Sequence, residues 1–432
     1  MPMNRMVLLV LLCWPVLLGA RDFYLTPEGS GRRNGAAWED ALDQAALSDA
    51  FDQLLKPGDC LWLGGGVYTN GTLRISIGGT PGLPKTVAGV DRGSGLPVLA
   101  GTWTEARPAQ GRTAIRIDPG ASDCIFRNLK IERCAIAVHA PGTGTVGTCS
   151  NLVFRNVTAE WVRHGFLLQH CDDVHFTECE VKHYTKHAFR FDQGCDRIRL
   201  ARAVADCSGG DAEWEKKTEV FPFGFLLNDA GEPNTGFTFE SCTAANNRMP
   251  LQENRYKNGD GFVVEQNSSN IVFLRCRALR NQDGGFDLKP SGVTLTNCVA
   301  VGNSRAYRLW RSAELQNCFA GWGATGLWCN GGPVNAVRCT FHRMDSAAVM
   351  TDDDATFPVT LKRCIISLAG QVSRKTGAGE VRISDSVVTG PGHSDPDPVY
   401  RQPSDAWSGL DDSMNSRAYK DKGYAFEDNE TM

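Results

Sequence analysis

Residues 271–309 read IVFLRCRALRNQDGGFDLKPSGVTLTNCVAVGNSRAYRL, and one pattern occurs twice within them. The pattern is apolar-x-apolar-x-x-Cys, and its two copies end at Cys276 and Cys298. The same register continues along the chain, with copies whose last position is Asn128, Asn156, Cys179, Ala203, Cys242, Cys318, Cys339 or Cys364 and a weaker copy that ends at Ser386. Most copies lie about 20–28 residues apart. This period predicts a solenoid, namely an all-β, right-handed parallel β-helix of about ten or more coils.

A second column of residues recurs once per coil, where a small residue precedes an apolar or aromatic one. Its members are Gly165-Phe166, Ala188-Phe189, Gly224-Phe225, Gly261-Phe262, Gly285-Phe286, Ala306-Tyr307, Gly326-Leu327 and Ala347-Ala348. Stacked strands place equivalent residues about 4.8 Å apart. Each column is therefore expected to form a row of side chains along the axis of the solenoid.

The placement of the cysteines favours free thiols over disulfide bonds. Of the 16 cysteines in the sequence, six share one column that points inward, namely Cys242, Cys276, Cys298, Cys318, Cys339 and Cys364. Cys149, Cys171 and Cys195 form a shorter row of the same kind. Small apolar thiols stack well in a core, so we expect them to be buried and unbonded. A zinc site is not expected, since no Cys-x-x-Cys pair is present.

The chain divides into four segments. An apolar run from Met6 to Leu18, followed by Gly19 and Ala20, is typical of a secretory signal peptide, so residues 1–20 are predicted to be removed. Residues 21–104 are predicted to form an N-terminal cap with the first coils, including a helix over 36–55. Residues 105–392 are predicted to be the β-helix that carries a groove, and 393–432 a C-terminal tail. The mature protein is expected to be secreted, to the extracellular or periplasmic space.

Charge and hydropathy limit the kinds of partner. The formal net charge is −4 at pH 7, and no basic run suggests binding to nucleic acid. After the N-terminal segment, no stretch approaches the roughly 20 apolar residues that cross a membrane. We expect a monomer. If its partner is anionic, local cations or a bound metal must attract that partner.

Three aspartates from two adjacent coils are candidate metal ligands. Asp260 precedes the glycine of the second column, Asp283 is expected next to the level of Asp260 one coil on, and Asp287 follows on the outward face of the next strand. Carboxylate oxygens are the ligands that calcium takes in proteins. The sequence therefore predicts a Ca²⁺ site, and the alternative is a set of solvated turn aspartates.

Charged and aromatic side chains are predicted to line up on the same outer face. The column of Asp287 continues as Arg308 and Trp328 in the next two coils, Trp310 faces the same way, and Arg190 lies three coils earlier. Indoles pack on the apolar faces of sugar rings, and guanidinium groups bind carboxylates. Arg190, Trp310 and Trp328 are therefore candidates for binding an acidic polysaccharide. The alternative is an Asp287–Arg308 surface ion pair worth less than about 1 kcal/mol.

Two inserted loops, residues 207–223 and 246–259, are predicted to leave the same turn of neighbouring coils and to wall a groove. Long loops on a rigid scaffold often carry function. Arg255 and Lys257 in the second loop are further candidates for substrate binding.

At these residues the sequence resembles the family-nine polysaccharide lyases, the calcium-dependent β-helix enzymes that include pectate lyases and rhamnogalacturonan lyases. The resemblance consists of Asn-x-Asp-Gly-Phe at 258–262, Asp-x-Gly-Phe-Asp-Leu at 283–288, and a cationic residue in an aromatic-x-Leu setting at Arg308, some fifty residues in all. It implies that Asp260, Asp283 and Asp287 bind Ca²⁺. It also implies that metal and base together remove the proton α to a uronate carboxylate, after which the glycosidic oxygen leaves.

Two positions depart from the family pattern. Gly284 stands where the family has a further aspartate, which removes one calcium ligand, and Arg308 stands where it has the catalytic lysine. Arginine is a poor base, although other β-helix pectate lyases look to use one. Lys289 is the second candidate for the base, because it shares the face of Asp287 and a desolvated lysine gives up its proton more readily. His187 is a further possibility should neither act.

The sequence thus predicts a calcium-assisted lyase that cleaves a galacturonate-containing polysaccharide, such as pectate or rhamnogalacturonan, by β-elimination. One alternative is a non-catalytic carbohydrate-binding or structural β-helix, which Gly284 and Arg308 favour. Another is a β-helix glycoside hydrolase, which needs two carboxylates placed as acid and base. The obvious carboxylate clusters, at 172–173 and 352–354, lie away from the aromatic strip.

Overall fold

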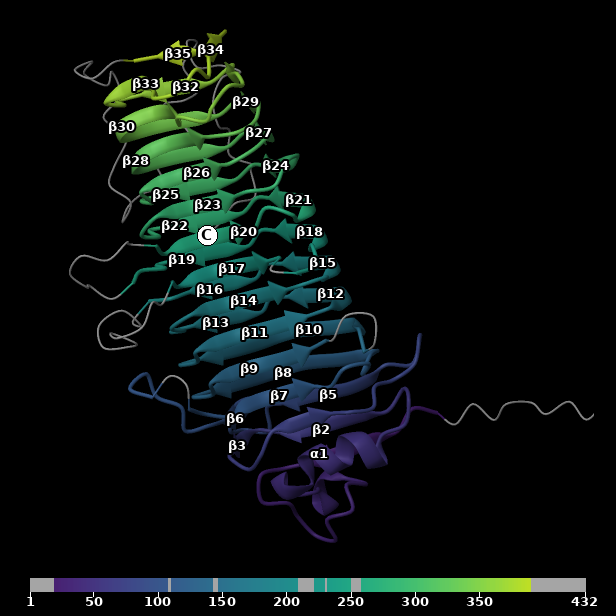
Figure 1. Ribbon diagram of the computed structural model, residues 1–432. Helices are drawn as coiled ribbons and strands as arrows, with labels where there is room; N and C mark the ends of the chain where they lie inside the picture. The colour runs from purple at the N-terminus through teal and green to yellow at the C-terminus, as the bar shows by residue number, and fades with distance from the viewer. Residues whose placement is uncertain are drawn as a thin grey trace, which may run out of the picture.

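The computed structural model describes residues 19–107, 110–142, 147–208, 221–229, 231–249 and 258–389. Their strands wind into one right-handed parallel β-helix, which rises from the helical N-terminal segment to the last coil (Figure 1). The predicted fold class is confirmed. The N-terminal 18 residues of the expected signal peptide, the tail from 393 and the candidates Arg255 and Lys257 all lie outside the described residues.

Each coil contributes to three parallel sheets, here called faces A, B and C. Face A contains β4 (Leu73–Ile75), β7 (Thr113–Ile117), β9 (Ile136–Pro141), β11 (His164–Gln169), β14 (His187–Asp192), β17 (Phe223–Asn228), β20 (Asp260–Val264), β23 (Gly284–Leu288), β26 (Arg305–Leu309), the second halves of β28 (Phe319–Cys329) and β30 (Thr340–Thr351), and β33 (Gln371–Lys375). Face B contains β1 (Asp22–Leu25), β2 (Cys60–Gly64), β5 (Lys85–Val90), the first halves of β8 (Cys124–Glu132) and β10 (Cys149–Glu160), β12 (Cys171–Thr177), β15 (Asp196–Ala201), β18 (Thr235–Glu240), β21 (Ser269–Leu274), β24 (Val293–Thr296), β27 (Ala313–Gln316), β29 (Val334–Val337), β31 (Val359–Lys362) and β34 (Val381–Ser384). Face C contains β3 (Gly66–Tyr68), β6 (Pro97–Ala100), the remaining halves of β8, β10, β28 and β30, β13 (Glu180–Lys182), β16 (Val204–Asp206), β19 (Thr243–Ala245), β22 (Arg277–Leu279), β25 (Val299–Val301), β32 (Ile365–Ser367) and β35 (Val387–Val388).

The N-terminal segment covers the first coil with a short helical stretch. It consists of η1 (Trp38–Asp40), η2 (Gln44–Ala46), α1 (Leu47–Asp49) and η3 (Ala50–Leu54). The predicted helix over 36–55 is therefore too long, because the continuous part begins only after Asp43, whose side chain accepts a hydrogen bond from the backbone N–H of Ala45 (3.0 Å) and caps the first turn. Leu47 and Phe51 are buried against the open end of the stack. None of the helices within the described residues is long and apolar enough to cross a membrane.

From β8 onwards, a residue with left-handed backbone turns each coil from face B to face C. These residues are Asn128, Asn156, Glu178, Arg202, Ser241, Arg275, Asn297, Asn317, Arg338, Arg363 and Asp385, with φ between 48° and 56°. The predicted register is wrong by one residue at Asn128 and Asn156, since the inward column at those coils is Leu129 and Val157. Asparagine tolerates this conformation, and the side-chain amide of Asn156 donates to that of Asn128 in the previous coil (3.0 Å).

The cysteine column points inward as predicted. Cys242, Cys276, Cys298, Cys318, Cys339 and Cys364 are all buried, and the cysteines of the described residues stand free rather than in disulfides. Each thiol donates to a backbone carbonyl of the preceding coil, as Cys298 Sγ does to Phe273 O (3.6 Å). The row is thus held by packing and weak hydrogen bonds, with no covalent link between coils.

The second column forms a continuous stack of rings beneath face A. Phe166, Phe189, Phe225, Phe262, Phe286 and Tyr307 stack in consecutive coils with centroids 4.8–5.2 Å apart. The last predicted member, Ala347-Ala348, is wrong by one residue, because Leu327 pairs with Val349. An extra residue in β30, between Met344 and Ala347, shifts the register there.

His342 is a buried titratable group near the C-terminal end of the stack. Its Nδ1 lies 2.7 Å from Ser367 Oγ, and its ring packs edge-on against Trp322. Burial, and to a smaller extent the charge of Arg343, lowers the pKa of His342 to about 3. In the unfolded chain the imidazole takes up its proton below about pH 6.5.

Since only the unfolded chain gains this proton between about pH 6.5 and 3, stability should fall as the pH falls through that window. In the His342→Gln variant the free energy of unfolding should depend less on pH. The difference in slope is the contribution of one proton, up to about 1.4 kcal/mol per pH unit. Urea unfolding at several pH values measures the two slopes, with Val67→Ala, an exposed side chain without a titratable group, as a control that keeps the wild-type slope. Parallel curves for wild type and His342→Gln would contradict the assignment.

Candidate functional site

The outer surface of face A carries the row of side chains that the sequence predicted. Asp287 pairs with Arg308 and Arg308 with Trp328 in successive coils. In the opposite direction the same column runs through Val263 and Leu226 to Arg190, three coils earlier. These residues point outward because their neighbours along each strand, such as Phe286 and Leu288, fill the interior.

Asp260 lies at the start of β20, in the column next to that of Asp287. The pairing of Phe262 with Phe286 places Asp260 level with Gly284, so Asp283 lies next to the level of Asp260, as the sequence predicted. The backbone N–H of Gly284 donates to Asp260 Oδ1. A Cβ atom at position 284 would lie 2.8 Å from that oxygen. Glycine at 284 therefore lets the carboxylate lie directly on the backbone of the next coil, and any larger residue would displace it.

Two arginines of β26 meet the other carboxylates. Arg305 Nη1 lies 2.5 Å from Asp283 Oδ1. Arg308 Nη1 lies 3.6 Å from Asp283 Oδ2 and 3.5 Å from Asp287 Oδ2, so its guanidinium group bridges the two acids. Sequence reasoning missed Arg305. Its column, Asp260–Gly284–Arg305, was the available signal.

The indole rings of Trp310 and Trp328 contact this group of charged side chains. Trp310 Nε1 donates to Asp287 Oδ1 at 2.6 Å. The guanidinium carbon of Arg308 lies 4.6 Å from the ring centroid of Trp310 and 5.2 Å from that of Trp328. A cation at this distance from an indole is attracted to its face. Arg308 is thus fixed by two carboxylates and two aromatic rings, and its side chain keeps 14% of its surface exposed.

Lys289, the other candidate base, lies at the end of β23. Its Nζ is 2.7 Å from both carboxylate oxygens of Glu265, a residue that the sequence reading did not single out. The Lys289 side chain is 27% exposed, about twice as much as that of Arg308. Of the two, Lys289 is the more accessible to a ligand on face A.

Asp260 is the least satisfied of the three acids. It is 1% exposed, and among the described residues its Oδ2 has no hydrogen-bond partner. Burial, followed by the charges of Asp287 and Asp283, holds the pKa of Asp260 well above its usual range. Burial also raises the pKa of Asp287, against the opposing charge of Arg308. The cluster therefore has a carboxyl group in need of a proton or a cation.

The carboxylates do not form a ready calcium site in this arrangement. The part of the chain that the structure describes contains no group of three His, Cys, Asp or Glu residues placed to hold a metal ion. Instead, the guanidinium group of Arg308 bridges Asp283 and Asp287. A calcium ion shared by these acids would require Arg308 to move, so the Ca²⁺ site stays a prediction.

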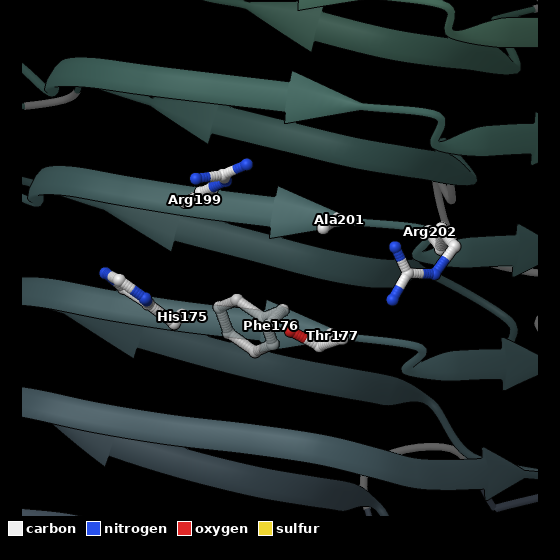
Figure 2. Close-up of a pocket in the computed structure, with 6 residues that line it drawn as sticks. All are labelled: His175, Phe176, Thr177, Arg199, Ala201 and Arg202. Atoms are coloured by element: carbon white, nitrogen blue, oxygen red, sulfur yellow. The ribbon is translucent and has the colours of Figure 1, made fainter.

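A shallow hollow of about 270 Å³ lies elsewhere, on face B. Its lining comes from β12, β15 and the corner after β15, and consists of His175, Phe176, Thr177, Arg199, Ala201 and Arg202 (Figure 2). Arg199 pairs with Glu240 (2.6 Å) and Arg202 with Glu178 (3.0 Å). These arginines are paired with acids, as Arg308 is on face A, but the lining of this hollow includes no indole against which a sugar ring could pack.

The charge balance of the cluster predicts opposite effects for two similar substitutions. In the presence of a chelator, Asp260→Asn should raise the free energy of unfolding at pH 7 by about 1 kcal/mol, because it removes a buried charge that has a raised pKa. Asp283→Asn should lower it by about 1–2 kcal/mol, since it removes the partner of Arg305 and Arg308. Urea unfolding measures both free energies.

The gain in stability from Asp260→Asn should shrink as the pH falls towards about 4, where the unfolded chain also holds the proton. Destabilisation by Asp260→Asn at pH 7 would contradict this account.

Comparisons with known proteins agree with the fold. The family described as a right-handed β-helix region matches residues 143–328. A search of curated protein sequences finds no match. The solved structure of pectate lyase Pel9A is similar, with a TM-score of 0.52 and 15% identity over 87% of this chain and 82% of that one. The A-module of mannuronan C-5 epimerase AlgE6 from Azotobacter vinelandii is also similar, with a TM-score of 0.54 and 14% identity over 81% of this chain and 96% of that one. At such identities the likeness shows the fold alone.

Proposed function

We propose that this protein is an exported enzyme that binds an acidic polysaccharide along face A and cleaves it by β-elimination. The observation that carries the proposal is the fixed Arg308 guanidinium, placed between two buried carboxylates and two indoles on an outward strip. A cation beside aromatic rings suits a sugar that carries a carboxylate. Pectate and mannuronan, in the names of the two similar structures, are both polymers of uronic acids. The resemblance to family-nine lyases and the signal peptide over residues 1–20 are parts of the same proposal.

β-Elimination breaks the bond between the α-carbon of a uronate and its hydrogen, forms a carbon–carbon double bond, and expels the glycosidic oxygen on the β-carbon. Negative charge grows on the uronate carboxylate as the proton leaves, so a fixed cation lowers the barrier. Arg308 is suited to that task, because its carboxylate and indole partners keep it charged and in place. We assign proton removal to Lys289, the more accessible cation, with Glu265 at 2.7 Å to accept the proton that the lysine must first release. The expelled oxygen takes its proton from water.

Formation of an unsaturated uronide, followed by its ultraviolet absorbance on polygalacturonate and on rhamnogalacturonan, tests the reaction directly. Lys289→Ala should reduce the rate by about 10²–10⁴-fold, as expected for loss of a general base, with little change in substrate binding. Arg308→Ala should reduce both rate and binding. Lys362→Ala, on an exposed part of face B, is the matched control. If Lys289→Ala keeps full activity while Arg308→Lys exceeds the wild type, position 308 holds the base instead.

Calcium is tested independently of activity. If Ca²⁺ binds the three aspartates, calcium chloride should raise the melting temperature of the wild type, because a ligand of the folded state stabilises it by mass action. Asp260→Asn and Asp287→Asn should not respond. Sodium chloride at equal ionic strength controls for screening. An unchanged wild-type melting temperature would leave the arginines as the cations of the site, and any lyase activity would then proceed without calcium.

A carbohydrate-binding protein without catalysis is the second candidate. Arg305 and Arg308 already balance Asp283 and Asp287, as expected where a charged cluster positions a ligand and does not react with it. Binding of a uronate polymer, without unsaturated product and without solvent deuterium entering the sugar at its α-carbon, would favour this candidate. Deuterium entry without an unsaturated product would instead indicate epimerisation, which shares the first proton transfer.

A further inference from the structure

A second group of polar side chains lies on face A, nearer the N-terminus. His164 on β11 and His187 on β14 pair in successive coils, and their column continues through Phe223 to Asp260. The neighbouring column places Arg190 beside them, three coils from Asp287. At about 4.8 Å per coil, the two groups are separated by about 14 Å along the axis. A polymer that follows the axis would therefore pass both.

The two histidines are held in defined neutral forms. Arg163 Nη1 lies 3.3 Å from His164 Nε2, and Arg190 Nη1 lies 3.4 Å from His187 Nδ1. Because a guanidinium group can only donate, each of these ring nitrogens accepts, and the proton sits on the other nitrogen. Burial and the surrounding cations, among them Arg163, Arg190 and Lys186, hold the pKa of both histidines well below the usual range.

One of these protons has no acceptor among the described residues. His164 is 6% exposed, and within the described residues its Nδ1 has no hydrogen-bond partner. A buried donor without a partner costs about 1–3 kcal/mol. The atom thus marks a place where an oxygen atom of a ligand would be stabilising.

Arg190 is positioned from below and keeps part of its surface free. Its Nε donates to Asp192 Oδ1 at 2.8 Å, and Asn228 Nδ2 donates to the same oxygen at 2.9 Å. The Arg190 side chain is 23% exposed, while Asp192 is buried. The carboxylate therefore orients the guanidinium group, and part of the Arg190 side chain remains exposed on the strip.

We propose that His164, His187 and Arg190 form a second sugar-binding position, which takes a uronate residue of the same polymer that occupies the strip at Asp287. Arg190 binds the carboxylate of that sugar, and His164 Nδ1–H donates to one of its oxygens. This inference rests on the proposed function and extends it, because it fixes the substrate class as a polymer with uronates at separated positions. It also gives the binding strip on face A a reach of at least four coils.

The test is calorimetric titration of the full-length mature protein with galacturonate and mannuronate oligomers, a dimer and a hexamer of each. The wild type should bind the hexamer of at least one series more tightly than its dimer. Arg190→Gln should weaken the hexamer about tenfold or more, as expected for loss of a charge-assisted hydrogen bond, and should leave the dimer nearly unchanged. His164→Phe, which removes the buried donor but no charge, should weaken the hexamer in the same selective way.

Arg199→Gln is the matched control, since Arg199 also pairs with a carboxylate but lies on face B (Figure 2). Hexamer affinity equal to the wild type in both Arg190→Gln and His164→Phe would overturn the second position, even if unsaturated product still forms. Selective loss of hexamer binding without any unsaturated product would support the position and refute the elimination. Equal loss for the dimer and the hexamer would also overturn it, because the residues would then act on the whole strip or on the fold.

Discussion

The parallel pairing of each coil with the next is the constraint on which every other feature depends. Because the strands are in register and about 4.8 Å apart, a residue at one position of a coil meets its counterparts above and below it. The interior then consists of rows of like residues, such as the free thiols and the stacked phenylalanines. The same rule acts on the outside, where it brings together Asp287, Arg308 and Trp328, which are separated by about 20 residues along the chain.

The periodicity of the sequence was enough to predict the fold and the row on face A, because inward side chains repeat with the coil. Errors arose where local backbone geometry, not hydrophobicity, decides the register. Asn128 and Asn156 were placed inside, although they adopt the left-handed conformation of the corner. The extra residue in β30 displaced Ala347 in the same manner. The length of the helix in the cap was overestimated. The alanines would allow a helix to begin earlier, but Asp43 caps its first turn and so sets its start.

The charge interactions within the site were harder to predict than the residues that form it. Asp260, Asp283 and Asp287 were found from spacing, but the reach of Arg305 and the bridging geometry of Arg308 depend on side-chain conformations. Three acids and two guanidinium groups in a buried setting leave Asp260 with a raised pKa and with an oxygen that has no hydrogen-bond partner among the described residues. The cluster retains its charges because carboxylates hold both arginines, and aromatic rings also contact Arg308. Face A therefore holds the guanidinium group of Arg308 in a fixed position, with part of its side chain exposed and its acidic partners buried.

The absence of covalent links between the coils of the cysteine row has a consequence for how such a protein changes over time. Each coil is a self-contained unit of pairing, so duplication or loss of one unit between β14 and β23 would leave the packing rules of its neighbours intact. It would, however, move the Arg190 position relative to Asp287 by one whole step. The distance between the two binding positions on face A can thus change only by whole coils. Selectivity for the length of a polymer substrate can therefore evolve, or be engineered, through the number of coils between the two binding positions, while the residues of both positions stay the same.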